Sequence, residues 1–348
     1  MMERVYLDWN ATTPLRPEAR AAMAAAMEVV GNPSSVHAEG RAAKALIERA
    51  RSQVAAALGA DGAEIVFTSG ATEAAALACA GRELVCGAVE HEAVLAWCAP
   101  SLPVDRLGRV AVADPARTAL QLANSETGVV QVLPAGLAVS DLTQAFGKLP
   151  IAFNWLGCEM GLVSAHKIGG PKGIGALVAR RGVDVAAQLR GGGQEMGRRA
   201  GTENLIGIAG FGAAAQAASR DLAAGLWEEV AQIRNILDCA LSSFGFETIS
   251  VGNEAERLPN TVSVIAPGWK GESQIMAMDL AGFAISAGSA CSSGKVRVSK
   301  VLRAMGYDDG QAGQAIRVSL GPGIGKSDVL RFAETWATDY RRILARVA

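Results

Sequence analysis

Charged residues are scarce in this 348-residue sequence, and long apolar runs are absent. Only 19% of the residues are Asp, Glu, Lys or Arg, and the formal net charge is −1, so no field would attract a polyanion. Together with the lack of a basic cluster interleaved with aromatic residues, this argues against a nucleic-acid partner. No run of about 18 apolar residues exists to cross a membrane, and Glu3, Arg4 and Asp8 lie where a signal peptide would be apolar. We therefore expect a cytoplasmic protein with no membrane partner.

Cysteine and histidine are also few. The six cysteines form no CxxC pair in a chain too large to need disulfides, so we interpret them as free thiols. The three histidines, His37, His91 and His166, lie far apart in the sequence and have no metal-ligand spacing, so we expect no metal site. The low charged fraction leaves surface for a second subunit to cover and favours an oligomer.

Short apolar runs alternate with helical segments, which is typical of a mainly parallel α/β sheet. The expected strands span residues 65–67, 83–85, 119–123, 174–178, 260–266 and 282–288, and the expected helices 17–30, 40–58, 222–243 and 327–347. The third of these helices would join two parts of the chain. We predict a large domain over residues 15–243 and a smaller one from residues 1–14 and 244–348.

Two segments have compositions that suit ligand binding: one could bind an aldehyde covalently, and the other could bind an anion such as phosphate. Lys167 lies in SAHKIGGPKGIG (164–175), where small residues would let its amine approach an aldehyde to form a Schiff base. By itself this segment could equally be a surface lysine in a glycine-rich turn. The segment TSGATE (68–73) stands between a strand and a helix, where free N–H groups and the Thr72 hydroxyl could bind a phosphate, although an ordinary helix cap has the same residues.

Single polar residues elsewhere fit the same chemistry. Asp141, with Gln144 beside it, could keep the pyridine nitrogen of pyridoxal 5'-phosphate (PLP) protonated, as PLP enzymes require. His91 follows a strand-like run and could stack on a cofactor ring. Arg317, in AIRVSLG, is in a strand-like position where a guanidinium needs a carboxylate, from the protein or from a substrate.

Cys291 lies in a segment of small residues, SAGSACSSG (286–294), followed by Lys295 and Arg297. Structural cysteines are more often surrounded by large apolar side chains. A thiol in a small-residue loop near cations has a lowered pKa and reacts readily. The composition therefore favours a reactive thiol over a structural one.

In this order the segments resemble the cysteine desulfurases of the NifS/IscS type. The resemblance covers nearly the whole chain. Its segments are YLDWNATTP (6–14), GNPSSVH (31–37), FTSGATE (67–73), VEH (89–91), SETG (125–128), DLTQAFGK (141–148), SAHKIGGPKGIGAL (164–177), GGGQEMGRRAGTEN (191–204), LPNTVSV (258–264), GSACSSG (288–294) and IRVSLG (316–321). The resemblance implies the α/β fold of PLP-dependent transferases of fold type I. This fold has a mainly parallel seven-stranded sheet with helices on both faces, plus a smaller α+β domain.

The resemblance also implies a set of cofactor-binding residues. These are Ala71, Thr72, Ser125, Asp141, Gln144, Ser164, His166, Lys167 and Thr202. Among them, Lys167 would bind the cofactor covalently, Gln144 would face its phenolic oxygen, and Thr202 would reach the phosphate of the neighbouring subunit in a homodimer.

The implied reaction takes sulfur from L-cysteine and leaves L-alanine, with Lys167, Cys291 and His91 as the catalytic residues. Arg317 would bind the substrate carboxylate, with Asn32 and Asn10 in the same pocket. Sulfur would remain as a persulfide on Cys291 and pass to an acceptor such as an iron–sulfur scaffold protein. Ten positions separate Cys291 from Val301, which leaves room for the long catalytic loop of the NifS/IscS group.

The sequence departs from the family pattern near the proposed cofactor site. Ser125 replaces the usual second Asn before Glu126, and only 13 positions separate Gly128 from Asp141, so a usual helix is nearly absent there. Two alternatives remain open. The chain could be a selenocysteine lyase or related PLP enzyme, or a PLP-binding inactive paralogue that acts as an assembly subunit.

Overall fold

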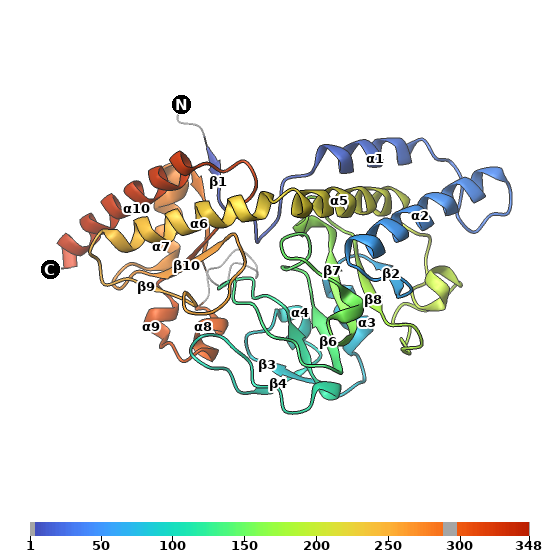
Figure 1. Cartoon of the computed structure of the whole chain (residues 1–348), viewed down its shortest axis with the longest axis horizontal. Coiled ribbons are helices and arrows are strands. Elements are labelled where there is room, and N and C mark those ends of the chain that lie inside the picture. The colour runs from blue at the N-terminus through green and yellow to red at the C-terminus, as the bar shows by residue number, and fades with distance from the viewer. Residues whose placement is uncertain (1–3, 288–297, 348) are drawn as a thin grey trace.

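The computed structural model describes residues 4–287 and 298–347, which form two units placed side by side (Figure 1). The larger unit is built on a five-stranded sheet. In spatial order its strands are β2 (Glu64–Thr68), β8 (Gly175–Ala179), β7 (Cys158–Ser164), β6 (Leu137–Asp141) and β5 (Ala119–Gln121). The last three run parallel to one another, whereas β8 is antiparallel to both of its neighbours.

Two further strands extend this row. β3 (Val85–Gly87) and β4 (Ala99–Leu102) pair in parallel, and a parallel bridge from Val85 to Thr118 connects them to the β5 side. In the described part of the chain, the five-stranded sheet and this strand pair together contain seven strands, the number expected. The α/β fold class and the mainly parallel sheet are confirmed.

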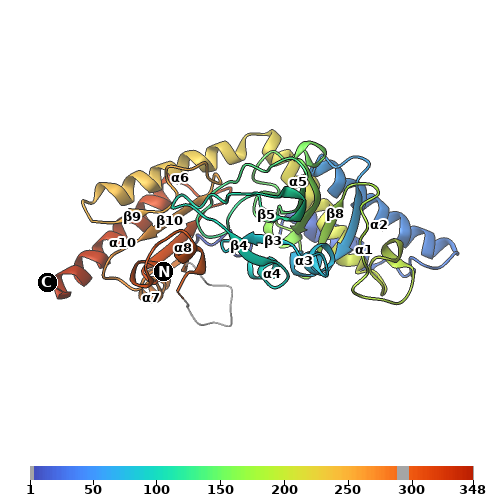
Figure 2. The ribbon, with the colours of Figure 1, turned by 90° about the horizontal axis from the view of Figure 1, so that it is seen from below.

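Helices cover both faces of this sheet because its strands bury side chains on both sides. On β2, Ile65 and Phe67 face one hydrophobic core, and Val66 faces another, as the alternation of a strand requires. The helices on the first side are α1 (Pro17–Met27), α2 (Ala38–Ala57) and α5 (Leu205–Ala223), and those on the second are α3 (Ala71–Cys79) and α4 (Glu92–Leu95). Figure 2 shows the same arrangement from below.

The smaller unit has a four-stranded antiparallel sheet covered by helices. Its strands, in spatial order, are β12 (Ser286–Ala287), β13 (Ala315–Ser319), β10 (Thr261–Ile265) and β9 (Ile249–Ser250). Its helices are α6 (Leu226–Ser243), α7 (Gly271–Leu280), α8 (Lys300–Ala304), α9 (Asp309–Ala312) and α10 (Lys326–Val347). A cluster of stacked, tilted and edge-to-face rings lies in its core, from Phe246, Trp269, Trp336 and Tyr340.

The N-terminal segment belongs to this smaller unit. β1 (Val5–Tyr6) pairs in parallel with β11 (Phe283–Ala284), and Val5 and Leu7 join its hydrophobic core. The helix expected over 222–243 is instead the end of α5 and all of α6. They are separated at Gly225, whose φ of +76° is the left-handed conformation that glycine adopts without strain. The domain boundaries at residues 14 and 244 remain a prediction.

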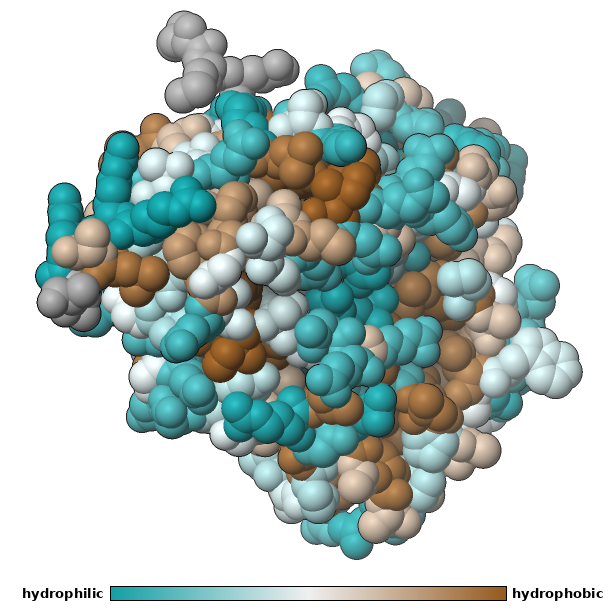
Figure 3. Space-filling model, turned by 60° about the vertical axis from the view of Figure 1, so that its left-hand side comes forward, coloured by the Kyte–Doolittle hydropathy of each residue, from teal (hydrophilic) through white to brown (hydrophobic). Residues whose placement is uncertain are grey.

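Short 3₁₀ turns complete the described elements, at Pro115–Arg117, Phe153–Trp155, Ala165–Lys167 and Gln194–Gly197. None of the described helices is long and apolar enough to cross a membrane. On the face seen in Figure 3, hydrophobic patches interrupt the polar surface. The described cysteines, Cys79, Cys86, Cys98, Cys158 and Cys239, are free thiols, which confirms the prediction for these five.

Candidate active site

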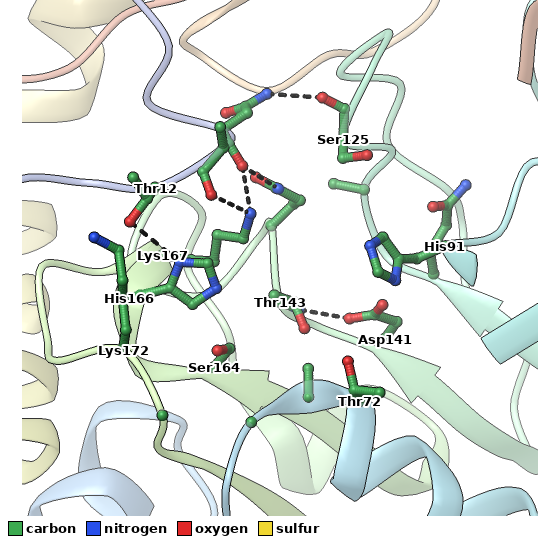
Figure 4. A pocket seen from close by; sticks show the side chains of 18 of the residues that line it. Thr12, Thr72, His91, Ser125, Asp141, Thr143, Ser164, His166, Lys167 and Lys172 are labelled. Atoms are coloured by element: carbon green, nitrogen blue, oxygen red, sulfur yellow. Dashed lines mark hydrogen bonds between the residues drawn. The ribbon is translucent and has the colours of Figure 1, made fainter. Parts of the chain in front are cut away.

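A cavity of about 620 Å³ opens where three parallel strands end. Gln121, Asp141 and Ser164 are the last residues of β5, β6 and β7, and ligands of α/β proteins bind at such carboxyl ends. The lining residues are Asn10, Ala11, Thr12, Ser69, Gly70, Ala71, Thr72, His91, Gln121, Ala123, Ser125, Asp141, Thr143, Gln144, Ser164, His166, Lys167, Lys172, Gly173 and Arg317. Most of the residues that the sequence singled out therefore lie around one space (Figure 4).

One end of the cavity is the N-terminus of α3. Gly70 caps this nine-residue helix without a side-chain hydrogen bond, so the first N–H groups of the helix are available to an anion. Figure 4 places Thr72 and Ser164 at this end. Lys172 lines the same cavity, and its positive charge adds to the attraction for a phosphate.

Lys167 extends into the cavity from the turn that follows β7. Its Nζ donates to the carbonyl oxygens of Asn10, at 2.5 Å, and Ala11, at 2.9 Å. These residues belong to the N-terminal segment, which returns from the smaller unit. Both of these acceptors are neutral backbone carbonyl oxygens, and they hold the amine inside the cavity, where an aldehyde could reach it.

His166, next to Lys167, is neutral at physiological pH. Burial, aided by the positive charges of Lys167 and Lys172, lowers its pKa to about 4. Its Nδ1 lies 3.2 Å from the Thr12 hydroxyl. A neutral imidazole has one N–H group, which can donate a hydrogen bond to a phosphate without the ring taking up a second proton.

Asp141 and His91 lie on the side of the cavity opposite Lys167 (Figure 4). The Asp141 carboxylate accepts a hydrogen bond from the backbone N–H of Thr143 at 2.9 Å, which fixes its direction. Nδ1 of His91 accepts from the N–H of Ala93 at 3.1 Å, so its Nε2 carries the proton. A flat ring between Lys167 and His91 would have a carboxylate at its edge and an imidazole on its face.

Arg317 reaches the cavity from β13 and is nearly buried. Its guanidinium donates to Asp8 Oδ1 at 2.7 Å and to the carbonyl oxygen of Ser125 at 3.0 Å. Its Nε has no hydrogen-bond partner in the described chain. A buried donor without a partner is costly, so the guanidinium, which lines the cavity, keeps hydrogen-bonding capacity that its described partners do not use.

The Ser125 carbonyl supports two site residues. It accepts from Arg317 and also from Asn10 Nδ2, at 3.1 Å. Both bonds use the backbone, so they do not depend on whether Ser or Asn occupies the position. Replacement of the usual Asn therefore changes only the side chain that faces the cavity.

Glu126 links this wall to the start of α8. It accepts a hydrogen bond from the Ser299 hydroxyl at 2.5 Å. Burial raises the pKa of Glu126 to about 7, although this bond, Arg317 and His91 act in the opposite direction. In the sequence, Ser299 follows the segment that contains Cys291.

Three predicted residues are not in the described lining of the cavity. Thr202 lines a neighbouring cavity of about 190 Å³. Asn32 is exposed between α1 and α2, where its Oδ1 accepts from the N–H of Ser34. Cys291 lies outside the described residues. The roles of all three remain predictions, and the first depends on a second subunit.

The sequence analysis missed several lining residues. These are Thr12, Ser69, Gln121, Thr143 and Lys172, together with Lys148, which contacts two lining residues from behind. Four of these residues belong to segments that carry the family resemblance: Thr12, Thr143, Lys148 and Lys172. For them, the sequence did not show that the side chain points towards the cavity. Gln121 had no signal beyond its place at the end of an expected strand.

Comparisons of the sequence with known proteins identify the family of this chain. The aminotransferase class-V family model matches residues 5–101 and 113–332. A cysteine desulfurase from Cereibacter sphaeroides is 41% identical over 92% of this chain and 91% of its own length. The cysteine desulfurase IscS of Dictyoglomus turgidum is 35% identical over 94% of this chain and 92% of its own. The chain belongs to the cysteine desulfurases of the class-V aminotransferase family.

A solved structure supports membership of the cysteine desulfurases in three dimensions. The X-ray structure of a NifS-like protein from Rickettsia africae superposes with a TM-score of 0.88 at 30% identity, covering 97% of this chain and all of that one. The resemblance drawn from the motifs is thereby confirmed. So is the PLP-enzyme fold, since this family is PLP-dependent.

Proposed function

We propose that this chain is a PLP-dependent cysteine desulfurase that forms L-alanine and a persulfide on Cys291. One observation carries the proposal. A single cavity brings together a reactive amine (Lys167), a free helix N-terminus (at Gly70), an edge carboxylate (Asp141) and a guanidinium with an unused N–H (Arg317). A selenocysteine lyase would use the same groups, so Cys291 distinguishes the two.

The residues present fit PLP. The start of α3, with Ala71 and Thr72, and the side chains of Ser164 and His166 would hold its phosphate. Asp141 would pair with the pyridine nitrogen, and Lys167 would bind the aldehyde. When bound, PLP supplies an electron sink that stabilises negative charge next to the substrate amine.

The chain's own residues would then act in order. Arg317 binds the carboxylate of L-cysteine through its guanidinium and so directs the Cα–H bond towards Lys167. Lys167 takes the Cα proton. The Cys291 thiolate attacks the substrate sulfur, so that an S–S bond forms while the Cβ–S bond breaks, and Cβ takes a proton to become the methyl group of L-alanine. His91 also lines the cavity, and its Nε2 carries a proton that it can relay.

The sulfur is expected to pass to an acceptor, and the IscS name of one relative supports an iron–sulfur scaffold protein. A homodimer in the cytoplasm is expected as well. Large hydrophobic side chains such as Val132 (91% exposed) and Trp155 (89% exposed) leave apolar surface for a second subunit.

The purified chain should show a visible absorbance band after addition of PLP and should release alanine and sulfide from L-cysteine with a thiol reductant. An inactive paralogue would keep the band and form no alanine. A selenocysteine lyase would act on L-selenocysteine and leave L-cysteine unchanged. Absence of the band would contradict the proposed cofactor and with it the whole function.

The Arg317→Lys variant should lower kcat/KM for L-cysteine by about 10- to 100-fold, mainly through KM. Lysine keeps the charge beside Asp8 but loses the flat donor edge that matches a carboxylate. Steady-state kinetics of alanine formation would test this. The matched control is Arg303→Lys, because Arg303 pairs with Asp309 away from the cavity. An unchanged KM would contradict the assigned role.

A further inference from the structure

Lys148 is a buried lysine whose described contacts are amide oxygens. It is only 2% exposed, and its Nζ lies 2.9 Å from Asn10 Oδ1 and 2.8 Å from Gln144 Oε1. No ion pair among residues 4–287 and 298–347 includes it. Because lysine is almost never fully buried unless it is paired, its presence needs an explanation other than charge pairing.

The surroundings of Lys148 favour a neutral amine. Burial lowers its pKa well below the usual value, and the positive charges of Lys167 and Arg317 lower it further. A neutral amine has two N–H donors, and the two amide oxygens accept both. An ammonium group would carry a third donor, for which the described hydrogen bonds give no acceptor.

These two bonds fix the direction of two side-chain amides that line the cavity. With Oε1 of Gln144 bound to Lys148, its Nε2 faces the other way and donates to the Asn10 carbonyl at 2.9 Å. The same carbonyl accepts from Lys167 Nζ. Nε2 of Gln144 and Nζ of Lys167 therefore meet at one oxygen atom.

Asn10 is held in the same way. Its Oδ1 accepts from Lys148 and from Asn260 Nδ2, while its Nδ2 donates to Thr261 Oγ1 at 2.8 Å and to the Ser125 carbonyl. Asn10 thus connects the larger unit with strand β10. Lys148 supports the cavity from behind, because it is absent from the described lining whereas both of its partners belong to it.

We propose that Lys148 is a positioning residue that keeps the amide nitrogen of Gln144, and not its oxygen, directed at the Asn10 carbonyl where the Lys167 amine also binds, and so at the group attached to that amine. The inference rests on the proposed PLP function. An N–H donor at that place opposes protonation of the nitrogen that joins Lys167 to the cofactor. A turned amide would put an oxygen there and would favour protonation instead.

The test is a double-mutant cycle on the holoenzyme without substrate. Lys148→Met removes both donors at similar volume, and the pH midpoint of the visible cofactor band should rise by about one unit. Gln144→Ala should also raise this midpoint. If Lys148 acts through Gln144, the Lys148→Met shift should nearly vanish in the Gln144→Ala background. Equal shifts in both backgrounds, or no shift, would overturn the proposal.

A second measurement needs no cofactor. A base that is neutral in the folded chain but has a pKa of about 10.4 when unfolded makes the folded state more stable as pH rises. Between pH 7 and 9, the unfolding constant of the wild type should therefore fall as pH rises, by up to about tenfold per pH unit, relative to that of Lys148→Met. A ratio that does not change with pH would mean a charged lysine in the fold and would contradict the two-donor arrangement.

The control variant is Lys326→Met, which removes an exposed lysine at the start of α10 and should leave both the midpoint and the stability ratio unchanged. If Lys148→Met does not fold, Lys148→Gln, which keeps a polar end group in the same space, should go through the same cycle. A wild-type chain without a visible band would refute the proposed function. In that case the stability measurement would still show whether Lys148 is neutral in the folded chain.

Discussion

Replacement of Lys167 by alanine should lower L-alanine formation by at least about ten thousandfold, the scale seen when a residue that bonds covalently is lost. Lys167 is expected both to bind the cofactor and to take the Cα proton, so no second group can replace it. Its Nζ is already inside the cavity, 2.5 Å from the Asn10 carbonyl. Noncovalent cofactor binding should persist, because the start of α3 and Ser164 are unchanged.

Borohydride reduction followed by peptide mapping would test the attachment directly. In the wild type the reduced cofactor should be found on Lys167, and in the alanine variant on no lysine. Lys172→Ala is the matched control, because Lys172 lines the same cavity but should leave the adduct on Lys167. A wild-type adduct on Lys172 or Lys148 would refute the assignment.

Replacement of Cys291 by serine should lower alanine production by at least about a hundredfold while the cofactor still binds. Chemistry at Cα needs Lys167, Asp141 and Arg317, and none of these depends on the thiol. The visible band of the variant should therefore still change when L-cysteine is added. Only sulfur transfer should fail, because a hydroxyl is a far weaker nucleophile than a thiolate.

Mass spectrometry would locate the transferred sulfur. After brief exposure of the wild type to L-cysteine, the peptide with Cys291 should gain one sulfur atom. Cys239→Ser is the control, because Cys239 is the exposed one among the five described free thiols and its loss should not change turnover. Normal alanine formation by Cys291→Ser, or a persulfide found solely on another cysteine, would contradict the desulfurase mechanism.

Local patterns predicted most elements of the larger unit. Short apolar runs gave β2 and β8 within a residue or two, and the alanine-rich segment from Pro17 gave α1. The strands β4, β6 and β7 and the helices α4 and α5 were not predicted. In β6 and β7 the apolar residues come in short runs, LAV and GLV, and such runs have no period that separates a buried strand from a buried helix. The break at Gly225 was also missed.

The sequence by itself determined the family and the residue types of the site, because motifs such as SAHK and TSGATE keep reactive groups within a few positions of each other. It could not determine which side chains from distant segments face one another. Only the tertiary structure brought Asn10 to Lys167 and Lys148, across 157 and 138 positions, and Asp8 to Arg317 across 309. These contacts depend on how the N-terminal segment passes between the two units. That path is set by packing of both cores, which no local pattern of residues encodes.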